Sequence, residues 1–162
     1  MYRVGIITAS DKGSIGERQD LSGAKIQSIV EEHGYRVDFY QILPDEKSLL
    51  QETMQRLCDE HTVDLLLTTG GTGFSVRDVT PEATTSIAER MVPGIAEAMR
   101  AYSMTITKRA MLSRGVAAIR KSTLIINLPG SPKAVEESLT YIIEELRHGL
   151  EILTGEAGEC AR

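Results

Sequence analysis

Three glycines lie within four residues in the stretch Thr68-Thr69-Gly70-Gly71-Thr72-Gly73. This stretch follows the apolar run at residues 63 to 67, a pattern typical of a buried strand that ends in a turn. Glycine has no Cβ, so it adopts positive φ angles and lets backbone N–H groups approach a ligand closely. A concave row of N–H groups at the end of a strand suits a phosphate or a carboxylate. The stretch is therefore a candidate anion-binding loop.

An acidic residue, Asp78, follows this loop and precedes Thr80 and Pro81. Thr80 is the expected N-cap of a helix, with Pro81 at the first helical position. Amides that hold an anion would then lie beside an acid that could hold a cation. Glycine-rich turns after strands also occur where nothing binds, and neither a P-loop nor a dinucleotide fingerprint is present. The pattern alone leaves both interpretations open.

A second loop of the same kind follows the strand expected at residues 124 to 128. Its sequence is Pro129-Gly130-Ser131-Pro132-Lys133. Ser131 is the expected N-cap of the last helix and Pro132 its first residue. The N-terminus of a helix attracts anions, and Lys133 adds positive charge. This loop is a second candidate anion site.

The first half of the chain reads as β-α-β-α-β, with strands at residues 2 to 9, 35 to 43 and 63 to 67. This order indicates a parallel sheet, and ligands gather beyond the carboxyl ends of its strands. Asp11, Asp45 and the loop from Gly70 to Asp78 each follow a successive strand, so we expect them to share one site. Spacing alone also favours Asp45 as the N-cap of the next helix.

The second half continues with a helix expected at residues 80 to 104, broken at residues 92 to 94. Two short strands, at residues 116 to 119 and 124 to 128, suggest a hairpin or another antiparallel pair. The last helix carries an apolar stripe that we expect to pack on the sheet. The fold class is therefore α/β.

Composition indicates one domain. With 162 residues, 41% of them hydrophobic and 25% charged, the chain resembles an ordinary globular protein. We expect a single domain at residues 1 to 155 and a short polar tail at residues 156 to 162. No signal peptide or membrane-spanning segment is indicated, so the expected location is the cytoplasm, without a membrane partner.

Cysteine and histidine indicate no disulfide framework and no metal cluster. Cys58 is expected in the core and Cys160 lies in the polar tail. The three histidines each fall near a predicted helix C-terminus, where we interpret them as capping or surface residues: His33, His61 and His148.

A basic segment at residues 98 to 135 contains no Asp or Glu, although the net charge of the chain is −5. It could attract an anionic ligand, or it could be a solvated face or a subunit contact. A nucleic-acid partner is disfavoured, because the segment has one aromatic residue for base stacking and the chain is acidic. Its positive residues are Arg100, Lys108, Arg109, Arg114, Arg120, Lys121 and Lys133.

Four ordered motifs together resemble the MogA/MoaB family of molybdenum cofactor biosynthesis, and the chain is also similar to the G domains of gephyrin and of plant Cnx proteins. The resemblance covers nearly the whole chain, from Ser10 and Asp11 to about the last helix. The motifs are Thr69-Gly70-Gly71-Thr72-Gly73, Arg77-Asp78-Val79-Thr80-Pro81-Glu82-Ala83, Met111-Leu112-Ser113-Arg114 and Asn127-Leu128-Pro129-Gly130-Ser131-Pro132.

This resemblance implies a three-layer α/β/α fold with a mostly parallel central sheet, a homotrimer, and molybdopterin adenylyltransferase activity. In that reaction the phosphate of molybdopterin attacks the α-phosphorus of ATP, with Mg²⁺, and pyrophosphate leaves. The product would pass to a downstream molybdate-inserting enzyme. The chemistry needs positioning and charge neutralisation more than a protein nucleophile, so the absence of an obvious nucleophile and base is no objection.

The resemblance also implies roles for individual residues. The two functional aspartates of the family match Asp45 and Asp78, which would be catalytic and bind or orient Mg²⁺. Residues expected to bind substrate or nucleotide are Ser10, Asp11, Gly70, Gly71, Thr72, Gly73, Thr80, Ser113, Asn127, Pro129, Gly130 and Ser131. The Arg-Asp-Val-Thr-Pro form of the second motif is MogA-like and favours an enzyme. The alternative is a non-catalytic molybdopterin carrier or scaffold.

Overall fold

A computed structural model describes residues 1–156 of the chain. Within these residues six strands form one sheet in the order β2-β1-β3-β6-β5-β4. The strands are β1 (Arg3–Ala9), β2 (Arg36–Leu43), β3 (Leu65–Thr69), β4 (Arg90–Met91), β5 (Ala117–Arg120) and β6 (Thr123–Leu128). The helices are α1 (Asp11–Ser14), α2 (Leu21–Glu32), α3 (Lys47–Asp59), α4 (Thr80–Ile87), α5 (Pro93–Met104) and α6 (Pro132–Leu153), with a 3-10 helix, η1, at Lys108–Leu112.

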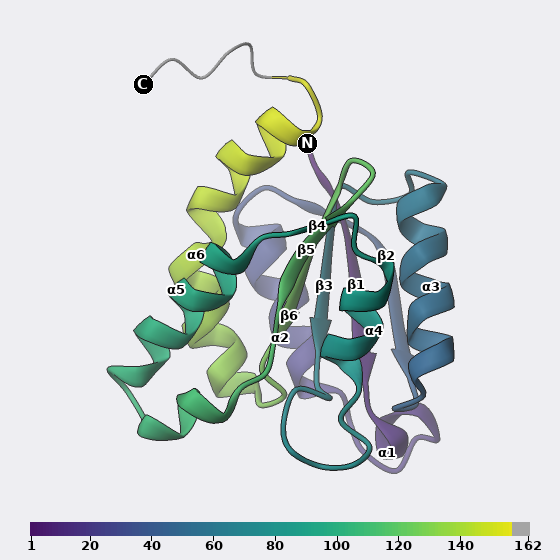
Figure 1. The fold of residues 1–162 in the computed structure, drawn as a ribbon, viewed down its shortest axis with the longest axis vertical. Coiled ribbons are helices and arrows are strands. Elements are labelled where there is room, and N and C mark those ends of the chain that lie inside the picture. The colour runs from purple at the N-terminus through teal and green to yellow at the C-terminus, as the bar shows by residue number, and fades with distance from the viewer. Residues whose placement is uncertain (157–162) are drawn as a thin grey trace.

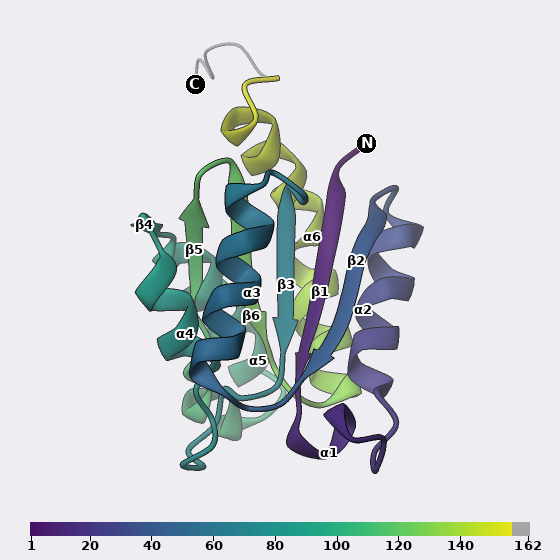
Figure 2. The ribbon, with the colours of Figure 1, turned by 90° about the vertical axis from the view of Figure 1, so that its right-hand side faces the viewer.

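The sheet is mostly parallel. Strands β2, β1, β3 and β6 run in one direction, and their carboxyl ends meet at the edge where α1 and several loops lie (Figure 1 and Figure 2). Strand β5 pairs antiparallel with both β6 and β4. The antiparallel pair expected from the sequence is therefore confirmed. The four parallel strands β2, β1, β3 and β6 therefore deliver their following loops to a common edge.

Helices cover both faces of the sheet, so the structure has three layers (Figure 2). Helices α2, α5 and α6 enclose one hydrophobic core, and α3 and α4 enclose the other. Strands β3 and β6 are buried along their whole length, as expected for strands covered on both faces. The predicted α/β class, three layers and mostly parallel sheet are confirmed.

The break in the second half differs from the prediction. The helix that begins at Thr80 ends at Ile87, and residues 90 and 91 then pair with β5 before α5 begins at Pro93. The residue before a proline avoids the helical region, which favours extended backbone at this point. Strand β4 is defined only by its pairing with β5, so local sequence did not indicate it.

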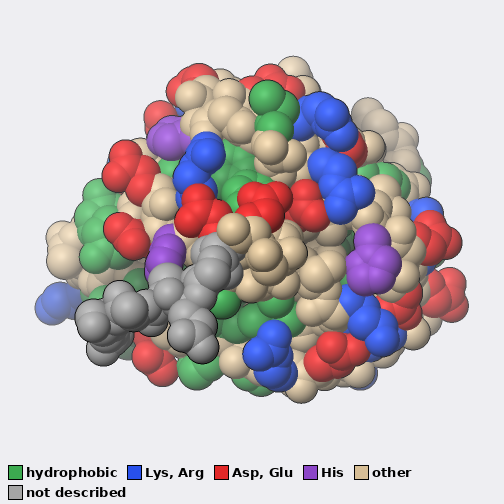
Figure 3. Space-filling view, turned by 90° about the horizontal axis from the view of Figure 1, so that it is seen from above, with side chains coloured by type: hydrophobic (Ala, Val, Ile, Leu, Met, Phe, Trp, Pro, Cys, Tyr) green, Lys and Arg blue, Asp and Glu red, His purple; other side chains and the backbone are tan. Residues whose placement is uncertain are grey.

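The end of the molecule opposite the carboxyl edge carries intermingled acidic and basic side chains, together with histidines (Figure 3). His33 is the C-cap of α2, and His148 is an exposed residue of α6, so the interpretation of these two histidines as capping or surface residues is confirmed. Cys58 is buried and free. No helix within residues 1–156 is long and apolar enough to cross a membrane. Residues 157 to 162 of the expected tail, with Cys160, lie outside the described residues.

The central strand β6 offers a test of the packing. Ile126 is fully buried between β3 and β5, so Ile126→Ala should lower the free energy of unfolding by about 2–5 kcal/mol. The matched control is Ile152→Ala, because Ile152 on α6 is 51% exposed and its change should stay within about 0.5 kcal/mol. Urea denaturation measures both. Equal losses would contradict the assignment of the core.

Candidate functional site

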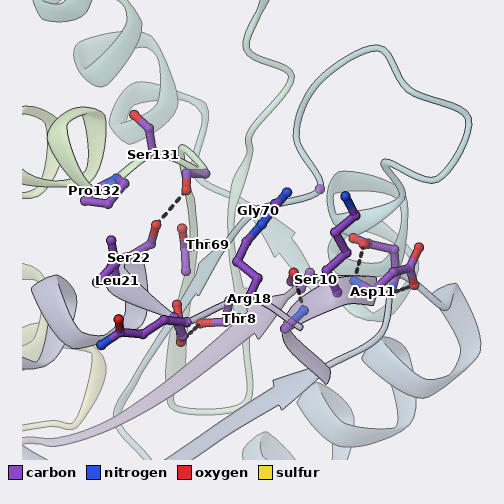
Figure 4. Close-up of a pocket in the computed structure, with 18 of the residues that line it drawn as sticks. Thr8, Ser10, Asp11, Arg18, Leu21, Ser22, Thr69, Gly70, Ser131 and Pro132 are labelled. Atoms are coloured by element: carbon purple, nitrogen blue, oxygen red, sulfur yellow. Dashed lines mark hydrogen bonds between the residues drawn. The ribbon is translucent and has the colours of Figure 1, made fainter. Parts of the chain in front are cut away.

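A pocket of about 620 Å³ opens at the carboxyl ends of β1 and β3. Strand β2 lies on one side of β1 and the next strand of the chain, β3, lies on the other. Such a switch point is the usual binding position in an open α/β sheet. Figure 4 shows Ser131 and Pro132 on one side of the pocket and Asp11 on the other, with Thr69 and Gly70 between them. Its size is typical of a small-molecule site.

Two hydrogen bonds hold the wall formed by the β6–α6 loop. The Ser22 hydroxyl donates to the carbonyl of Gly130 at 2.6 Å, and the Thr69 hydroxyl donates to the carbonyl of Pro129 at 2.6 Å (Figure 4 draws the first). Ser131 is the N-cap of α6 and accepts from the N–H of Ala134, as the sequence predicts. The N-terminus of a 22-residue helix therefore borders the pocket.

Asp45 is not the N-cap of α3, contrary to the spacing argument. Glu46 occupies that position and makes no side-chain cap bond. Asp45 instead accepts a hydrogen bond from the N–H of Asp11 at 3.0 Å, and Asp11 accepts one from the N–H of Asp45 at 2.9 Å. This reciprocal pair locks together the loops after β1 and β2. The carboxylate of Asp45 is thereby turned to the pocket lining.

The two carboxylates of this pair have opposite electrostatic environments. The Arg77 guanidinium donates two hydrogen bonds to Asp11 and one to Glu46, and it holds the pKa of Asp11 below its ordinary value. Burial raises the pKa of Asp45, and the negative charges of Asp11 and Asp78 raise it further. Asp45 therefore lacks a sufficient positive partner within the described residues.

Asp78 lies at the other end of the glycine loop and also lines the pocket. Its carboxylate accepts a hydrogen bond from the N–H of Ser75 at 3.0 Å, and its own N–H donates to the carbonyl of Ser75 at 2.9 Å. Side chains of Phe74 and Val76 on the same loop are exposed. The loop is thus folded on itself around Asp78.

Thr80 is the first residue of α4 and not its N-cap, which is Val79. Its N–H donates to the carbonyl of Gly71 at 3.1 Å, so the backbone of the glycine loop, and not a capping side chain, satisfies this N–H at the start of α4. The Thr80 hydroxyl is fully buried and has no hydrogen-bond partner in the described part of the chain. A Cβ on Gly71 would come within 2.3 Å of that hydroxyl, and Gly71 has φ of 68°.

The structure brings together eight of the residues assigned to the site from sequence. They line the pocket and are Ser10, Asp11, Asp45, Gly70, Gly71, Asp78, Gly130 and Ser131. Six others lie outside its lining: Thr72, Gly73, Thr80, Ser113, Asn127 and Pro129. Of these, Ser113, Asn127 and Pro129 line a separate cavity of about 220 Å³ between α5, η1 and α6.

Asn127 is 1% exposed and has a clear structural role. Its side-chain amide donates to the hydroxyls of Thr68 at 3.0 Å and Thr84 at 2.9 Å, which joins β6 to β3 and α4. Its side-chain oxygen accepts from the N–H of Val116 at 3.3 Å. These three bonds account for its burial without a ligand.

Asp20 lines the pocket but was not expected there. It is the N-cap of α2 and accepts from the N–H of Gly23, while the hydroxyls of Thr8 and Tyr40 donate to it at 2.6 and 2.5 Å. The sequence signal that could have found Asp20 is its position directly before a helix start, where aspartate is a preferred N-cap. Lys12 and Arg18 also line the pocket.

Comparison with known proteins identifies the family. Residues 5–148 match the family model described as "Probable molybdopterin binding domain". The chain belongs to this family. A molybdopterin adenylyltransferase of Helicobacter pylori (strain J99) is 41% identical over 154 residues, which cover 94% of this chain and 88% of that protein.

Solved structures and a larger relative agree with membership of the molybdopterin binding family. The molybdopterin biosynthesis enzyme MoaB from Thermus thermophilus is 46% identical, with a TM-score of 0.90 over 96% of this chain and 98% of that one. Gephyrin of Dictyostelium discoideum is 39% identical over 160 residues, which are 93% of this chain and 22% of gephyrin. The resemblance to the MogA/MoaB family and to gephyrin is therefore confirmed.

Asp45 should make stability depend on pH in a defined direction. Because its pKa is raised by folding, ionised Asp45 costs stability above its ordinary pKa, and the cost disappears as the pH falls. Asp45→Asn keeps an acceptor for Asp11 but cannot ionise. Relative to wild type, the variant should therefore be more stable at pH 7 than at pH 4. Urea denaturation at the two pH values would measure this difference in the free energy of unfolding.

Asp38→Asn is the control of opposite sign. Arg36 lowers the pKa of Asp38, so that carboxylate contributes stability that is lost as the pH falls. Relative to wild type, the Asp38 variant should therefore be less stable at pH 7 than at pH 4. If the Asp45 variant differs from wild type by the same free energy of unfolding at both pH values, folding does not raise the pKa of Asp45.

Gly71→Ala should be more destabilising than Gly34→Ala. Both glycines have positive φ, 68° and 81°, so the backbone strain of alanine is similar at the two positions. Only at Gly71 would the new methyl group overlap a buried hydroxyl, because the nearest atom at Gly34 is 3.6 Å away. Thermal unfolding of the two variants measures the difference, and equal midpoints would contradict the close contact with Thr80.

Proposed function

We propose that this protein is a molybdopterin adenylyltransferase of molybdenum cofactor biosynthesis. The observation that carries the proposal is the pocket at the carboxyl ends of β1 and β3, lined by both glycine loops and by Asp45 and Asp78. Relatives with that name are 41% identical over most of the chain and support it. The reaction transfers AMP from ATP to the phosphate of molybdopterin and releases pyrophosphate.

The chemistry fits a pocket without a protein nucleophile. An oxygen of the molybdopterin phosphate forms a bond to the α-phosphorus of ATP, and the bond from that phosphorus to the pyrophosphate oxygen breaks. Pyrophosphate leaves with the electron pair. Such a transfer is accelerated mainly by holding the two reactants in line and by stabilising the charge that develops. The pocket would supply both.

The N-terminus of α6 is the part of the pocket best suited to a phosphate. Ser131 caps it, Pro132 begins it, and the partial positive charge of the helix end favours an anion. Lys12 and Arg18 line the same pocket and add positive charge. We assign phosphate groups of the substrates to this end of the pocket and to the turn at Gly70 and Gly71.

The acidic side of the pocket fits Mg²⁺. Four carboxylates line the pocket: Asp11, Asp20, Asp45 and Asp78. A polyphosphate would be repelled by them unless a cation came with it, and the raised pKa of Asp45 means that its charge is poorly compensated. Bound Mg²⁺ would neutralise phosphate charge at the reaction centre.

Asp45 and Asp78 are the residues that we assign to Mg²⁺. Among the described residues no three His, Cys, Asp or Glu side chains are grouped closely enough to hold a metal ion alone. This agrees with Mg²⁺ held by one or two carboxylates together with substrate phosphates and water. The ion is therefore expected to arrive with the nucleotide.

Two further parts of the proposal concern assembly. A homotrimer and a downstream molybdate-inserting enzyme follow from the resemblance to the MogA/MoaB family. Exposed apolar residues near η1, among them Ile106, Met111 and Leu112, are compatible with a subunit contact. Light scattering of the purified protein would measure the oligomeric state.

The first experiment measures pyrophosphate release with Mg²⁺, ATP and freshly prepared molybdopterin, omitting each in turn. Release that requires all three supports the transferase. Stoichiometric binding of molybdopterin without release would favour the non-catalytic carrier or scaffold.

Asp78→Asn should reduce pyrophosphate release by at least about a hundredfold, because a carboxylate at the reaction centre is lost. The Asn side chain can still accept the bond from Ser75, so the melting temperature should change little. Asp59→Asn is the control, since Asp59 pairs with Arg120 and does not line the pocket. Unchanged turnover of the Asp78 variant would remove Asp78 from the mechanism.

A further inference from the structure

In the basic segment at residues 98 to 135, only residues 130 to 132 line the pocket, and none of its Lys or Arg side chains does. Several of these cations have partners within the protein. Arg120 pairs with Asp59, Lys121 with Glu89, and Lys133 with Glu137. Arg114 differs from these, because its bonds reach the loop that carries Asp78. Nothing in the transfer chemistry derived above uses this arginine.

Arg114 contacts both ends of the loop between β3 and α4. Its Nε donates to the carbonyl of Gly73 at 2.7 Å, and its Nη2 donates to the carbonyl of Asp78 at 2.8 Å. Its backbone N–H donates to the carbonyl of Thr72 at 3.0 Å. One residue from the segment between η1 and β5 therefore fixes the loop where it leaves the glycine turn and where it returns.

Two other contacts hold Arg114 itself in place. Its Nη1 forms an ion pair with Glu82 on α4, and this pair lowers the pKa of Glu82 despite partial burial of that side chain. Arg100 on α5 donates to the carbonyl of Ser113 at 3.4 Å and to that of Gly115 at 2.7 Å. The residues on both sides of Arg114 are thus anchored to α5, so the guanidinium is presented from a supported backbone.

We propose that Arg114 is a positioning residue that sets the place of the Asp78 carboxylate in the pocket by holding the carbonyls of Gly73 and Asp78. It acts through the loop and need not touch substrate. This inference rests on the proposed function of Asp78 for its effect on turnover, whereas its effect on the loop stands apart from any activity.

Lysine should not replace arginine at this position. The two carbonyls and Glu82 are met by three different nitrogen atoms of one planar group. An ammonium on a flexible stem carries the same charge but cannot present three donors in that fixed arrangement. Arg114→Lys therefore keeps the charge of the site and removes the geometry that holds the loop.

The first test is kinetic. With Mg²⁺, ATP and molybdopterin, Arg114→Lys should lower kcat for pyrophosphate release by about ten- to a hundredfold, the cost of a misplaced catalytic group. Arg120→Lys is the matched control, since three nitrogen atoms of the Arg120 guanidinium also donate, two to a carboxylate and one to a carbonyl, but none of these bonds reaches the loop that carries Asp78. Its kcat should remain within about twofold of wild type.

A double-variant cycle separates positioning from general destabilisation. If Arg114 acts through Asp78, then adding Arg114→Lys to an Asp78→Glu protein should lower kcat by much less than it lowers kcat in wild type. Arg120→Lys should have the same small effect in both backgrounds. Full additivity of the Arg114 and Asp78 changes would overturn the proposal.

Glu82→Gln provides a second variant that keeps the loop bonds. It removes the ion pair and leaves Arg114 free to donate to both carbonyls, so kcat should fall less than in Arg114→Lys. An equal or larger loss in Glu82→Gln would show that the ion pair, and not the bonds to the loop, is responsible.

Hydrogen exchange of the free protein tests the loop without reference to activity. In Arg114→Lys, amide exchange should rise in peptides that cover residues 70 to 79 and stay unchanged in β1 and β2. In Arg120→Lys the loop should exchange as in wild type. Unchanged exchange of the loop in Arg114→Lys would overturn the proposal even if wild type is active. If wild type releases no pyrophosphate, the proposed function fails, and exchange alone decides the role of Arg114.

Discussion

The convergence of loops at the carboxyl edge of the sheet depends on a glycine at position 70. A Cβ there would stand 2.3 Å from the carbonyl oxygen of Ala9, and the residue has φ of 87°. Gly130 lies close to Gly70, since a Cβ added to Gly130 would be in ordinary contact, 3.5 Å from the Cα of Gly70. The backbone of Gly70 therefore packs directly against the backbone of Ala9. The loops after β1, β3 and β6 can share one pocket for that reason.

Charge at this edge is not arranged for stability alone. Asp11 is compensated by Arg77, and Asp20 accepts three hydrogen bonds, but burial and neighbouring acids disfavour the ionised form of Asp45. Such unfavourable groups are common at functional sites, where they are retained because the ligand relieves them. A cation that enters with an anionic substrate would do so here. The pocket is thus suited to the pair better than to the anion by itself.

Periodicity and strand order were sufficient to predict the α/β class and the meeting of Asp11, Asp45 and the glycine loop at one edge, because these follow from parallel topology. The three layers were implied by the family resemblance. Capping was harder to predict. The spacing of Asp45 and Thr80 indicates N-caps, yet Asp45 binds the backbone of Asp11 and the carbonyl of Gly71 takes the N–H of Thr80. The partner of Asp45 lies on another loop, and Gly71 lies near the far end of the loop that leads to Thr80, so neither contact follows from local spacing. Asp20 was missed for the same reason, since its hydroxyl donors lie on separate strands.

The two edges of the sheet have a consequence for the behaviour of the chain at high concentration. Strand β4 pairs through only two residues, and both are exposed. At the opposite edge β2 carries an exposed ion pair between Arg36 and Asp38. Very short or charged edge strands are poor templates for pairing with another molecule. The sheet therefore ends on both sides in features that oppose edge-to-edge aggregation, while its fully buried strands β3 and β6 remain in the middle.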